Sequence, residues 1–459
     1  MEELSKLIQK RLESSAAHSP IPGRCSIHRV PERFHNMTQP SQYKPEVISI
    51  GPFHRKQQSL KAMDNLKMLY VRRLLTSTAE KNIKVEEVAT SIVKKEDWIA
   101  ILDACILSIM QREDEIRECY SESIDFNSSE FVDMMVIDGL FIIEMLIRAF
   151  SGIDMYNTPL CHNAWLCMKI EWDLLLLENQ LPFFVLRCLF DHIALPYQLK
   201  QIEGMSLGML VFCFLQSFLR RLPTEKNLPD TAQPLPEQCE DAKHLLDVLR
   251  ILFQPSPQSD KNMLVAKLPP SSPWKIMKDY IVAKFMKAVL EKFNRGGATT
   301  YDEYEVKLIP SATDLKSAGV RFKRGSEKES CMNFKFSSGG IFEISAIRFG
   351  DGTDMMLRNV IACEQLYSGR FNMSNYVILM DSLVNSAEDV EILRKVGIIK
   401  NYLGCDEDVS NIFNKLCIDI NVDGSRYDNT TQEVNKFYNQ SWHTWKAMLK
   451  RNISTTHGR

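Results

Sequence analysis

One segment, Phe131–Ile147, restricts the possible folds of this chain more than any other. Its sequence, FVDMMVIDGLFIIEMLI, is apolar on nearly every side of a helix. A surface helix of a globular protein shows one apolar stripe, whereas a helix that is apolar all round is covered by other elements. The segment therefore predicts a helix buried in the middle of a large body.

The composition agrees with such a body and excludes several classes of protein. Apolar residues make up 45% and charged residues 25% of 459 positions, which are average values for globular chains and exclude disorder throughout. Lys and Arg total 56 against 58 Asp and Glu, so no overall positive charge attracts nucleic acid, and we expect none as a partner. The length predicts about three domains or one large body with a single core.

Helical periodicity dominates the first half of the chain. Apolar residues recur at three- and four-residue steps in Leu60–Leu74, beneath a face rich in Lys and Arg, and again in Trp98–Ile109. Glu171–Leu189 also has the pattern of a buried helix. Pro182 must kink or restart that helix, because proline lacks the N–H group that a helix uses.

A break in composition follows, since nine of the 19 prolines lie between Leu222 and Trp274, around one helical run at Ala242–Phe253. Prolines at this density indicate exposed loops, so we place a lobe boundary there. We predict an N-terminal amphipathic helix or arm at 1–26, a helical lobe at 27–221 and a variable, Pro-rich connection at 222–274. A second lobe at 275–459, with a small sheet and C-terminal helices, packs on the first as one body.

The period changes beyond the boundary. Ser311–Asp314 has the spacing of a capping box for a short helix that Gly319 closes. Short strands are predicted at Val320–Phe322, Met332–Phe336 and Ile341–Ile347. Helices resume at about Asn359–Tyr367, Ala387–Val396, Glu407–Cys417 and Thr431–Ile453. The predicted class is mainly α with a small antiparallel β region (α+β), a large helical body with no Rossmann fold or barrel.

The sequence favours a soluble, cytoplasmic protein. The start, Met1-Glu2-Glu3, lacks the basic residues and apolar core of a signal peptide, and the 12 cysteines are predicted to be free, mostly buried thiols. Gly204–Leu219, the best candidate for a membrane span, would reach only about 24 Å of a core of roughly 30 Å, so we interpret it as a buried helix. A C-terminal helix with Trp442 and Trp445 on one side is predicted to dock on the body, with peripheral attachment to a membrane as the competing interpretation.

A series of blocks in a fixed order extends along nearly the whole chain. These blocks are IGPFH (50–54), IRECY (116–120), FVDMMVIDGLFIIEML (131–146), DLLLLENQLPFFVL (173–186), IPSATDLKSAGVRF (309–322), RNVIACEQ (358–365), YVILMDSLVNSAEDVEILRKVGII (376–399) and the tryptophan pair. From about Ile27 to Leu449 the chain resembles the plant family called domain of unknown function 247, or uncharacterised protein family 0481. The association of some grass members with pollen self-incompatibility implies recognition or signalling. Family members typically end in a transmembrane helix, whereas this chain ends in KRNISTTHGR, so the family's membrane location is not expected here.

Two motifs for chemistry are present in incomplete form. Gly204–Gly208 matches the G-x-S-x-G pattern of a nucleophile elbow, but no buried strand precedes it, which favours a turn or a helix start over a catalytic serine. Cys161, His162 and Cys167 offer three zinc ligands without a second pair of ligands nearby. The chain also lacks the loops that bind phosphates or dinucleotides. We therefore predict neither a metal nor a cofactor.

Acidic residues inside apolar helices are more informative. On the central segment Asp133 and Glu144 share one face, and Asp138 points away from them. Asp173 and Glu178 flank four leucines, and the amides of Asn179 and Gln180 follow. A buried carboxylate must be paired, hydrogen-bonded or protonated. Possible cationic partners in the sequence are Arg117, Arg148, Arg358 and Lys169.

Two interpretations of these carboxylates stay open. They form either a polar network that clamps helices together or a pocket with an acid of raised pKa. Similarly, His54 follows Gly51-Pro52 in a predicted turn and serves either in packing or in acid–base chemistry. The candidate catalytic residues are His54, Asp138, Asp173 and Glu178, and Glu178 is further predicted to be buried and hydrogen-bonded to backbone or to an arginine.

Two functions are consistent with these features of the sequence. The first is an interaction, recognition or signalling protein that binds a protein partner or a small molecule. The alternative is a cofactor-free acid–base enzyme of the cyclase or isomerase type, acting through buried carboxylates or His54. A deep apolar pocket with convergent carboxylates or His54 would favour the enzyme, and a solid core with satisfied polar groups would favour the binding protein.

Overall fold

The computed structural model describes residues 25–37, 42–82, 95–151, 163–195, 206–221, 241–253, 308–326, 332–366, 371–422 and 426–440. All of them belong to one compact unit, Met1–Gln254 with Leu308–Arg459, and a second unit, Pro255–Lys307, lies outside the described residues. Also outside them lie residues 1–24 of the arm predicted at 1–26, the pair Cys161-His162, Gly204 and the two C-terminal tryptophans.

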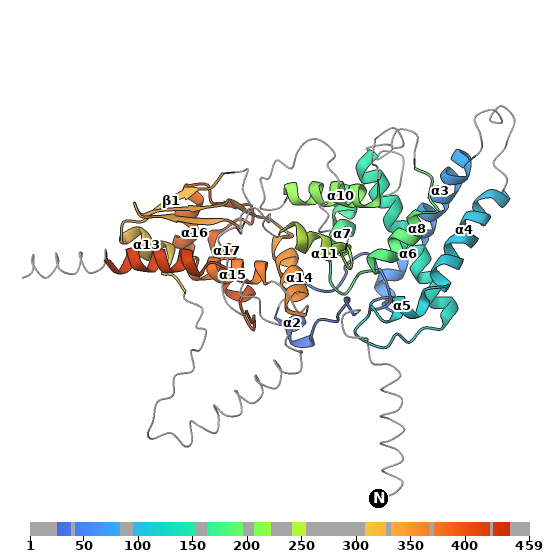
Figure 1. Cartoon of the computed structure of the whole chain (residues 1–459), viewed down its shortest axis with the longest axis horizontal. Helices are drawn as coiled ribbons and strands as arrows, with labels where there is room; N and C mark the ends of the chain where they lie inside the picture. The colour runs from blue at the N-terminus through green and yellow to red at the C-terminus, as the bar shows by residue number, and fades with distance from the viewer. Residues whose placement is uncertain are drawn as a thin grey trace, which may run out of the picture. The chain divides into compact units, whose positions relative to one another are not determined.

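The central helix that the sequence predicts is present as α6 (Ser128–Ser151). It packs against four other helices, which are α3 (Asp64–Asn82), α4 (Lys95–Met110), α8 (Phe183–Phe190) and α10 (Leu207–Arg221). Figure 1 shows α3, α4, α6 and α8 side by side. Gly139 allows α6 to approach α8 closely, because a Cβ atom there would lie 2.4 Å from Leu189 Cδ1. The cover that an apolar helix requires is therefore supplied by helices.

Shorter elements complete this part of the unit. They are α2 (Glu32–Asn36), the 3₁₀ helix η1 (Gln58–Met63), α5 (Glu113–Arg117), α7 (Ala164–Asp173) and α11 (Leu245–Leu252). Helix α11 is the predicted helical run inside the Pro-rich connection. Because 222–240 and 254–274 lie outside the described residues, the division into lobes stays a prediction.

The predicted helix over Glu171–Leu189 is wrong in its middle. Helix α7 ends at Asp173, residues 174–182 are not helical, and α8 begins after Pro182. The leucines of this stretch are nevertheless buried, since Leu174, Leu175, Leu176, Leu177 and Leu181 are at most 3% exposed. An apolar run without strict periodicity has the same appearance in a buried helix and in a buried loop, so the pattern cannot separate them.

The β region consists of two small sheets. In the first, β1 (Arg321–Arg324) and β2 (Phe334–Ser337) flank β3 (Ile341–Ile344). The β2–β3 pair is antiparallel and β1–β3 is parallel; in the second sheet β4 (Ile347–Phe349) pairs in parallel with β5 (Ile399–Asn401). The predicted antiparallel arrangement therefore holds only for β2–β3, which a tight turn connects. Side-chain alternation identifies strands but carries no information on their relative direction.

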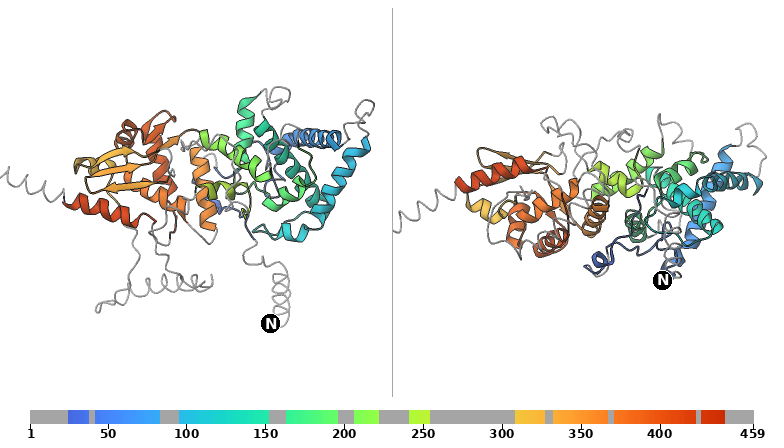
Figure 2. Two further views of the ribbon diagram at one scale, coloured as in Figure 1. Left: turned by 45° about the horizontal axis from the view of Figure 1, so that its top comes forward. Right: turned by 60° about the horizontal axis from the view of Figure 1, so that its bottom comes forward.

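Helices surround these strands. They include α13 (Ala312–Ser317), α14 (Thr353–Leu366), α15 (Asn372–Leu383), α16 (Ala387–Lys395) and α17 (Asp406–Leu416). The predicted cap of α13 is confirmed, since Ser311 Oγ accepts from Asp314 N and Gly319 follows at φ +92°. Figure 2 shows a further helix, residues 428–440, along the strands in red. It packs there through Phe437, whose ring centroid lies 5.5 Å from that of Phe336.

The fold is mainly α with a small β part, as predicted. No helix among the described residues is both long and apolar enough to span a membrane. The nine described cysteines are all free, in agreement with the prediction, although Cys405 is exposed and only Cys105, Cys119 and Cys363 are fully buried.

Candidate functional site

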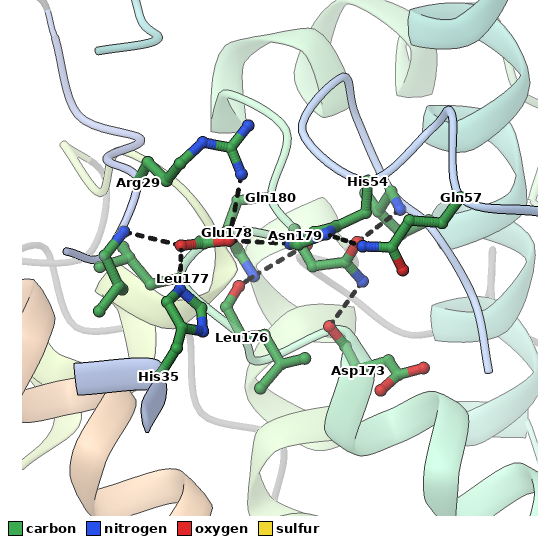
Figure 3. Close-up of polar contacts among 12 residues, drawn as sticks. Arg29, His35, His54, Gln57, Asp173, Leu176, Leu177, Glu178, Asn179 and Gln180 are labelled. Carbon is green, nitrogen blue, oxygen red and sulfur yellow. Dashed lines mark hydrogen bonds and ion pairs between the residues drawn. The ribbon is translucent and has the colours of Figure 1, made fainter. Parts of the chain in front are cut away.

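Glu178 lies at the centre of a buried polar cluster (Figure 3). Its side chain is 1% exposed. Oxygen Oε1 accepts from the backbone N–H of Val30 at 2.7 Å and contacts His35 Nε2 at 2.9 Å. Oxygen Oε2 lies 3.0 Å from His54 Nε2 and accepts from Arg29 Nη1 at 3.4 Å. The prediction that Glu178 is buried and bonded to backbone or to an arginine is confirmed, and it has both partners.

The surroundings of Glu178 keep it ionised. Burial alone would raise its pKa, but hydrogen bonds and positive charge from His35 and His54 outweigh burial and lower the pKa to about 2. Gln57 orients His54 from the other side, with its Nε2 2.7 Å from His54 Nδ1.

Asp173 and Asn179 hold a different stretch of chain, residues 46–50. Asp173 Oδ1 accepts from Glu46 N at 3.1 Å, and Oδ2 accepts from Val47 N at 2.7 Å and from Ile48 N at 2.8 Å. Asn179 Oδ1 accepts from Ile50 N at 2.7 Å, and Asn179 Nδ2 donates to Ile48 O at 3.0 Å. These two side chains occupy the place that a neighbouring strand would take beside an extended segment.

Asp138 of α6 binds the next residue of the same segment, Gly51. Its Oδ2 accepts from the backbone N–H of Gly51 at 2.9 Å, and its Oδ1 lies 2.5 Å from Lys67 Nζ. Lys67 is 1% exposed and also donates to the carbonyl oxygen of Ser49. A Cβ atom on Gly51, at φ +69°, would lie 2.7 Å from the carbonyl oxygen of Gln180, so only glycine fits at this turn.

The amides that follow Glu178 explain why residues 174–181 are buried without being helical. Asn179 Nδ2 donates to Asp173 O at 2.8 Å, and Gln180 Nε2 donates to Leu174 O at 2.7 Å and to Leu176 O at 2.8 Å. These carbonyls lie at or just after the C-terminus of α7, where a helix leaves its last acceptors unpaired. The block therefore provides its own hydrogen-bond donors, which a buried loop must have.

The structure brings some candidate residues together and separates others. His54 contacts Glu178, whereas Asp138 and Asp173 bind consecutive parts of 46–51. Asp133 is exposed, contrary to its placement among the buried acids, because the N-terminal part of α6 has one open face. Glu144 is 6% exposed and pairs with Arg148 at 2.5 Å. Of the four predicted cationic partners, Arg148 alone binds one of these buried acids among the described residues.

Burial also affects Asp173 differently from Glu178. It raises the pKa of Asp173 to about 6, although the backbone donors of Ile48, Glu46 and Val47 lower it, because no cation lies among the causes that act on this carboxyl. The two carboxyls lie five positions apart in one block and are shifted in opposite directions.

Four residues of the cluster were missed from the sequence. Lys67 continues the apolar spacing of Met63, Tyr70 and Leu74, so a helical wheel would have placed it on the buried face of α3. Asn359 of α14 accepts from Leu177 N at 2.9 Å and donates to Gln42 O at 2.8 Å. The other two are His35 and Arg29, for which no local pattern gives a signal.

A pocket of about 80 Å³ lies on the other side of the segment that Glu178 holds. One wall comes from residues 30–37, and the opposite wall comes from α14 and from the residues that end and follow α17. None of the four predicted catalytic residues lines it. Val30 belongs to both places, since its side chain lines the pocket while its N–H binds Glu178.

The two incomplete motifs can be placed only in part. Ser206 Oγ accepts from Met209 N at 3.3 Å at the start of α10, which agrees with the predicted helix start. Cys167 is half-buried on α7. Within the described ranges, no three His, Cys, Asp or Glu side chains converge as metal ligands would.

Comparisons with known proteins find relatives along nearly the whole chain. The family model for plant proteins of unknown function named DUF247 matches residues 27–457. UPF0481 protein At3g47200 of Arabidopsis thaliana is 31% identical over 445 residues, which cover 94% of this chain and 80% of that protein. Putative UPF0481 protein At3g02645, also of A. thaliana, is 25% identical over 470 residues, which cover 91% of this chain and 83% of that protein. No solved structure matches the chain. The chain therefore belongs to the DUF247 family of plant proteins of unknown function.

Proposed function

We propose that this protein recognises and binds a ligand and does not catalyse acid–base chemistry on it. One observation carries the proposal: the candidate acid–base groups are engaged with the protein's own chain, and the pocket lies elsewhere. Asp173 binds three backbone N–H groups, Asp138 binds Gly51 and Lys67, and Glu178 binds Val30 and His35. A general acid or base must instead reach the proton of a substrate.

The burial of these groups supports the same proposal. Asp138 is fully buried, Glu178 is 1% exposed and His54 is 2% exposed. Removing any one of them from its partners would leave buried donors unpaired, which is costly. A network in which every carboxylate oxygen has a partner is expected of a scaffold that fixes chain segments relative to one another.

What the scaffold fixes is one wall of the pocket. Glu178 binds Val30 and His35, which lie on either side of Pro31 and Phe34, two residues of that wall. His35 projects from α2 toward Glu178 in Figure 3. On its other side the ring of His35 packs edge-on against Tyr43, at 5.4 Å between centroids, and Tyr43 also lines the pocket. The cluster thus fixes residues 30–35, which form part of the pocket wall.

Equilibrium dialysis against a plant metabolite extract tests the proposal. The purified full chain is placed on one side of the membrane, and every compound is quantified on both sides by chromatography and mass spectrometry. A binding protein enriches one or more compounds on its side while the total amount of each is conserved. An isomerase or cyclase reduces that total and yields a product with a new retention time, even where the mass is unchanged.

Two variants make the result decisive. Glu178→Gln and Asp173→Asn keep the shape of each side chain and remove its capacity to act as a base. Conversion of any compound by the wild type that is lost in either variant would overturn the proposal in favour of the enzyme. Enrichment without conversion in the wild type, absent with heat-denatured protein, is the expected result.

A further inference from the structure

The pocket beside α2 has an apolar lining. Val30, Pro31 and Phe34 form one side, and Ile361 of α14, Leu416 of α17 and Ile420 form much of the other. Ile418 lies at the pocket too and is 43% exposed, which is a high value for an isoleucine in a protein with a large core. An apolar concave surface with exposed aliphatic side chains is characteristic of a site for an apolar group.

The volume limits what such a site can hold. At about 80 Å³ the pocket exceeds the roughly 10–15 Å³ that one water molecule needs. It is well below the roughly 300 Å³ at which sites for drug-sized ligands begin. The pocket therefore suits part of an aliphatic chain, since a cavity that binds a benzene ring measures about 150 Å³.

The charges around the pocket are unequal. Arg358 donates through Nε to Asp354 Oδ1 at 2.8 Å, and Arg33 forms an ion pair with Asp419. Lys415 also lines the pocket and is exposed; within the described part of the chain its ammonium group has no ion pair within 4.0 Å, and its charge acts on Asp354 from a longer distance. Of the charged residues that line the pocket, Arg358 and Lys415 are cations and Asp419 is an anion, so the lining carries one positive charge in excess.

The chain at this mouth has an unusual conformation. Among the described residues, Asp419 is the one non-glycine residue with positive φ, at 61°. It connects Ile418 and Ile420, so the turn at Asp419 directs both isoleucines to the pocket. The ion pair with Arg33 joins this turn to α2, the opposite wall. Unfavourable backbone conformations of this kind are concentrated at functional sites.

We propose that this pocket binds a small carboxylic acid with an apolar body, whose carboxylate pairs with Lys415 while its body lies against Phe34, Ile361 and Leu416. The inference rests on the proposed function, because it names the class of ligand that a binding protein of this shape takes. Lys415 supplies the charge that selects an anion, and the apolar lining supplies the affinity.

Calorimetric titration with three eight-carbon probes tests the choice of ligand. Octanoate, octanamide and octylamine share an apolar chain and differ at pH 7 in the charge of the head group. Octanoate should bind with one site per chain and about two- to fivefold more tightly than octylamine, the effect of one partly exposed ion pair. Lys415→Glu should reverse that order. Lys316→Glu makes the same charge change on exposed α13 and should leave the order unchanged.

Two further substitutions locate the site. Ala362→Trp fills the pocket from α14, and Ala100→Trp adds the same ring at an exposed position of α4. Ile418→Asp changes a residue that is already exposed, so it places a negative charge at the mouth even if Ala362→Trp does not fold. Octanoate binding should be lost in Ala362→Trp, kept in Ala100→Trp and weakened about two- to fivefold in Ile418→Asp.

Several results would overturn this inference. Equal affinity for octanoate and octylamine would remove the role of Lys415, and no measurable binding of any probe would remove the ligand class. Octanoate binding that survives both Ala362→Trp and Ile418→Asp would place the site elsewhere. These failures are distinct from failure of the proposed function, which conversion of a metabolite in dialysis would show whether or not octanoate binds.

Discussion

Two segments near the N-terminus are held by the same buried block in different ways. Within this block, residues 29–35 are held by one carboxylate, Glu178, which binds Val30 N at 2.7 Å together with the side chains of His35 and Arg29. Outside the block, Arg29 also pairs with Glu122 and Arg33 with Asp419. Residues 46–51 depend on three side chains, Asp173, Asn179 and Asp138, which accept five backbone N–H groups (those of residues 46, 47, 48, 50 and 51). The first attachment is concentrated in one residue, and the second is distributed.

The difference shows what determines the ionisation of a buried carboxyl. Both carboxyls are desolvated, yet the pKa of Glu178 falls to about 2 and that of Asp173 rises to about 6. Backbone N–H groups offer Asp173 partial charges only. His35 and His54 offer Glu178 hydrogen bonds and positive charge, and these outweigh burial. Cationic neighbours therefore distinguish the two places more than the number of hydrogen bonds does.

The largest expected effect comes from Lys67, the cation beneath the distributed attachment. Lys67→Ala leaves Asp138 buried and unpaired and should lower the free energy of unfolding by about 3–5 kcal/mol. Urea denaturation followed by circular dichroism measures it. Lys61→Ala, at an exposed position of η1, is the matched control and should change stability by less than about 0.5 kcal/mol.

A double substitution sharpens this prediction. Lys67→Met with Asp138→Asn removes both charges while the Asn oxygen can still accept from Gly51 N. This variant should recover much of the stability lost in Lys67→Ala, because the cost arises from an unpaired buried charge. A double variant no more stable than Lys67→Ala would show that packing of the Lys67 side chain, and not charge, is what matters at α3.

The concentrated attachment should be more sensitive to loss of its single acceptor. Glu178→Ala removes the acceptor of Val30 N and the carboxylate that contacts His35, and should destabilise by roughly 2–4 kcal/mol. Asp173→Ala should cost less, because Asn179 and Asp138 still hold residues 50 and 51. Hydrogen exchange read by mass spectrometry should show faster exchange at 29–35 in the first variant than at 46–51 in the second. Equal exchange in both segments would contradict the comparison.

The sequence predicted which polar residues of this site are buried, but it did not predict which residues they bind. A carboxylate and two amides inside an apolar run indicated a buried polar network, and Glu178 is indeed buried with a backbone and an arginine partner. Its partners lie 148 and 149 residues away, where no periodicity can assign them. His35 is one residue of a five-residue helix and has no neighbouring pattern to mark it.

The fold was predictable where periodicity or capping was unambiguous. α6 and α13 agree with the sequence because an all-apolar helix and a Ser–Asp cap each have one structural interpretation. The helix that the apolar pattern predicts at residues 174–181 is wrong, because the pattern carries no information on the amides of Asn179 and Gln180, whose donors take the place of helical hydrogen bonds. β1 pairs with β3 in parallel, and the alternation of side chains along a strand gives no information on the direction of its neighbour.

The opposite pKa shifts predict opposite dependences of stability on pH. The pKa of Glu178 is lowered from 4.5 to about 2, so its contribution is present above pH 4.5 and lost as the pH falls, by about 2 kcal/mol at pH 3. The pKa of Asp173 is raised from 3.8 to about 6, so its contribution is greatest below pH 3.8 and declines by about 2 kcal/mol from pH 4 to 7.

Denaturation curves across pH 3–7 separate the two carboxyls. Glu178→Gln should flatten the loss of stability below pH 4.5, and Asp173→Asn should remove the decline between pH 4 and 6. Glu122→Gln is the control for the first variant, since Glu122 pairs with the same Arg29 at 3.0 Å but is 49% exposed. A steeper acid loss in Glu178→Gln than in the wild type would show that the sign assigned to this group is wrong.

The smallest expected effect connects the concentrated attachment to the pocket. Glu178→Gln keeps an acceptor for Val30 N but removes the charge that faces His35 and Arg29, so the wall formed by residues 30–37 should be less well ordered. Ordering of the wall is then completed only when a ligand binds, which reduces affinity. We expect octanoate to bind about fivefold more weakly to this variant, with Asp173→Asn unchanged because residues 46–51 do not line the pocket. Calorimetric titration at pH 7 measures both. An equal loss of affinity in the two variants would show that the block supports the pocket as one unit and would remove the distinction between its two attachments.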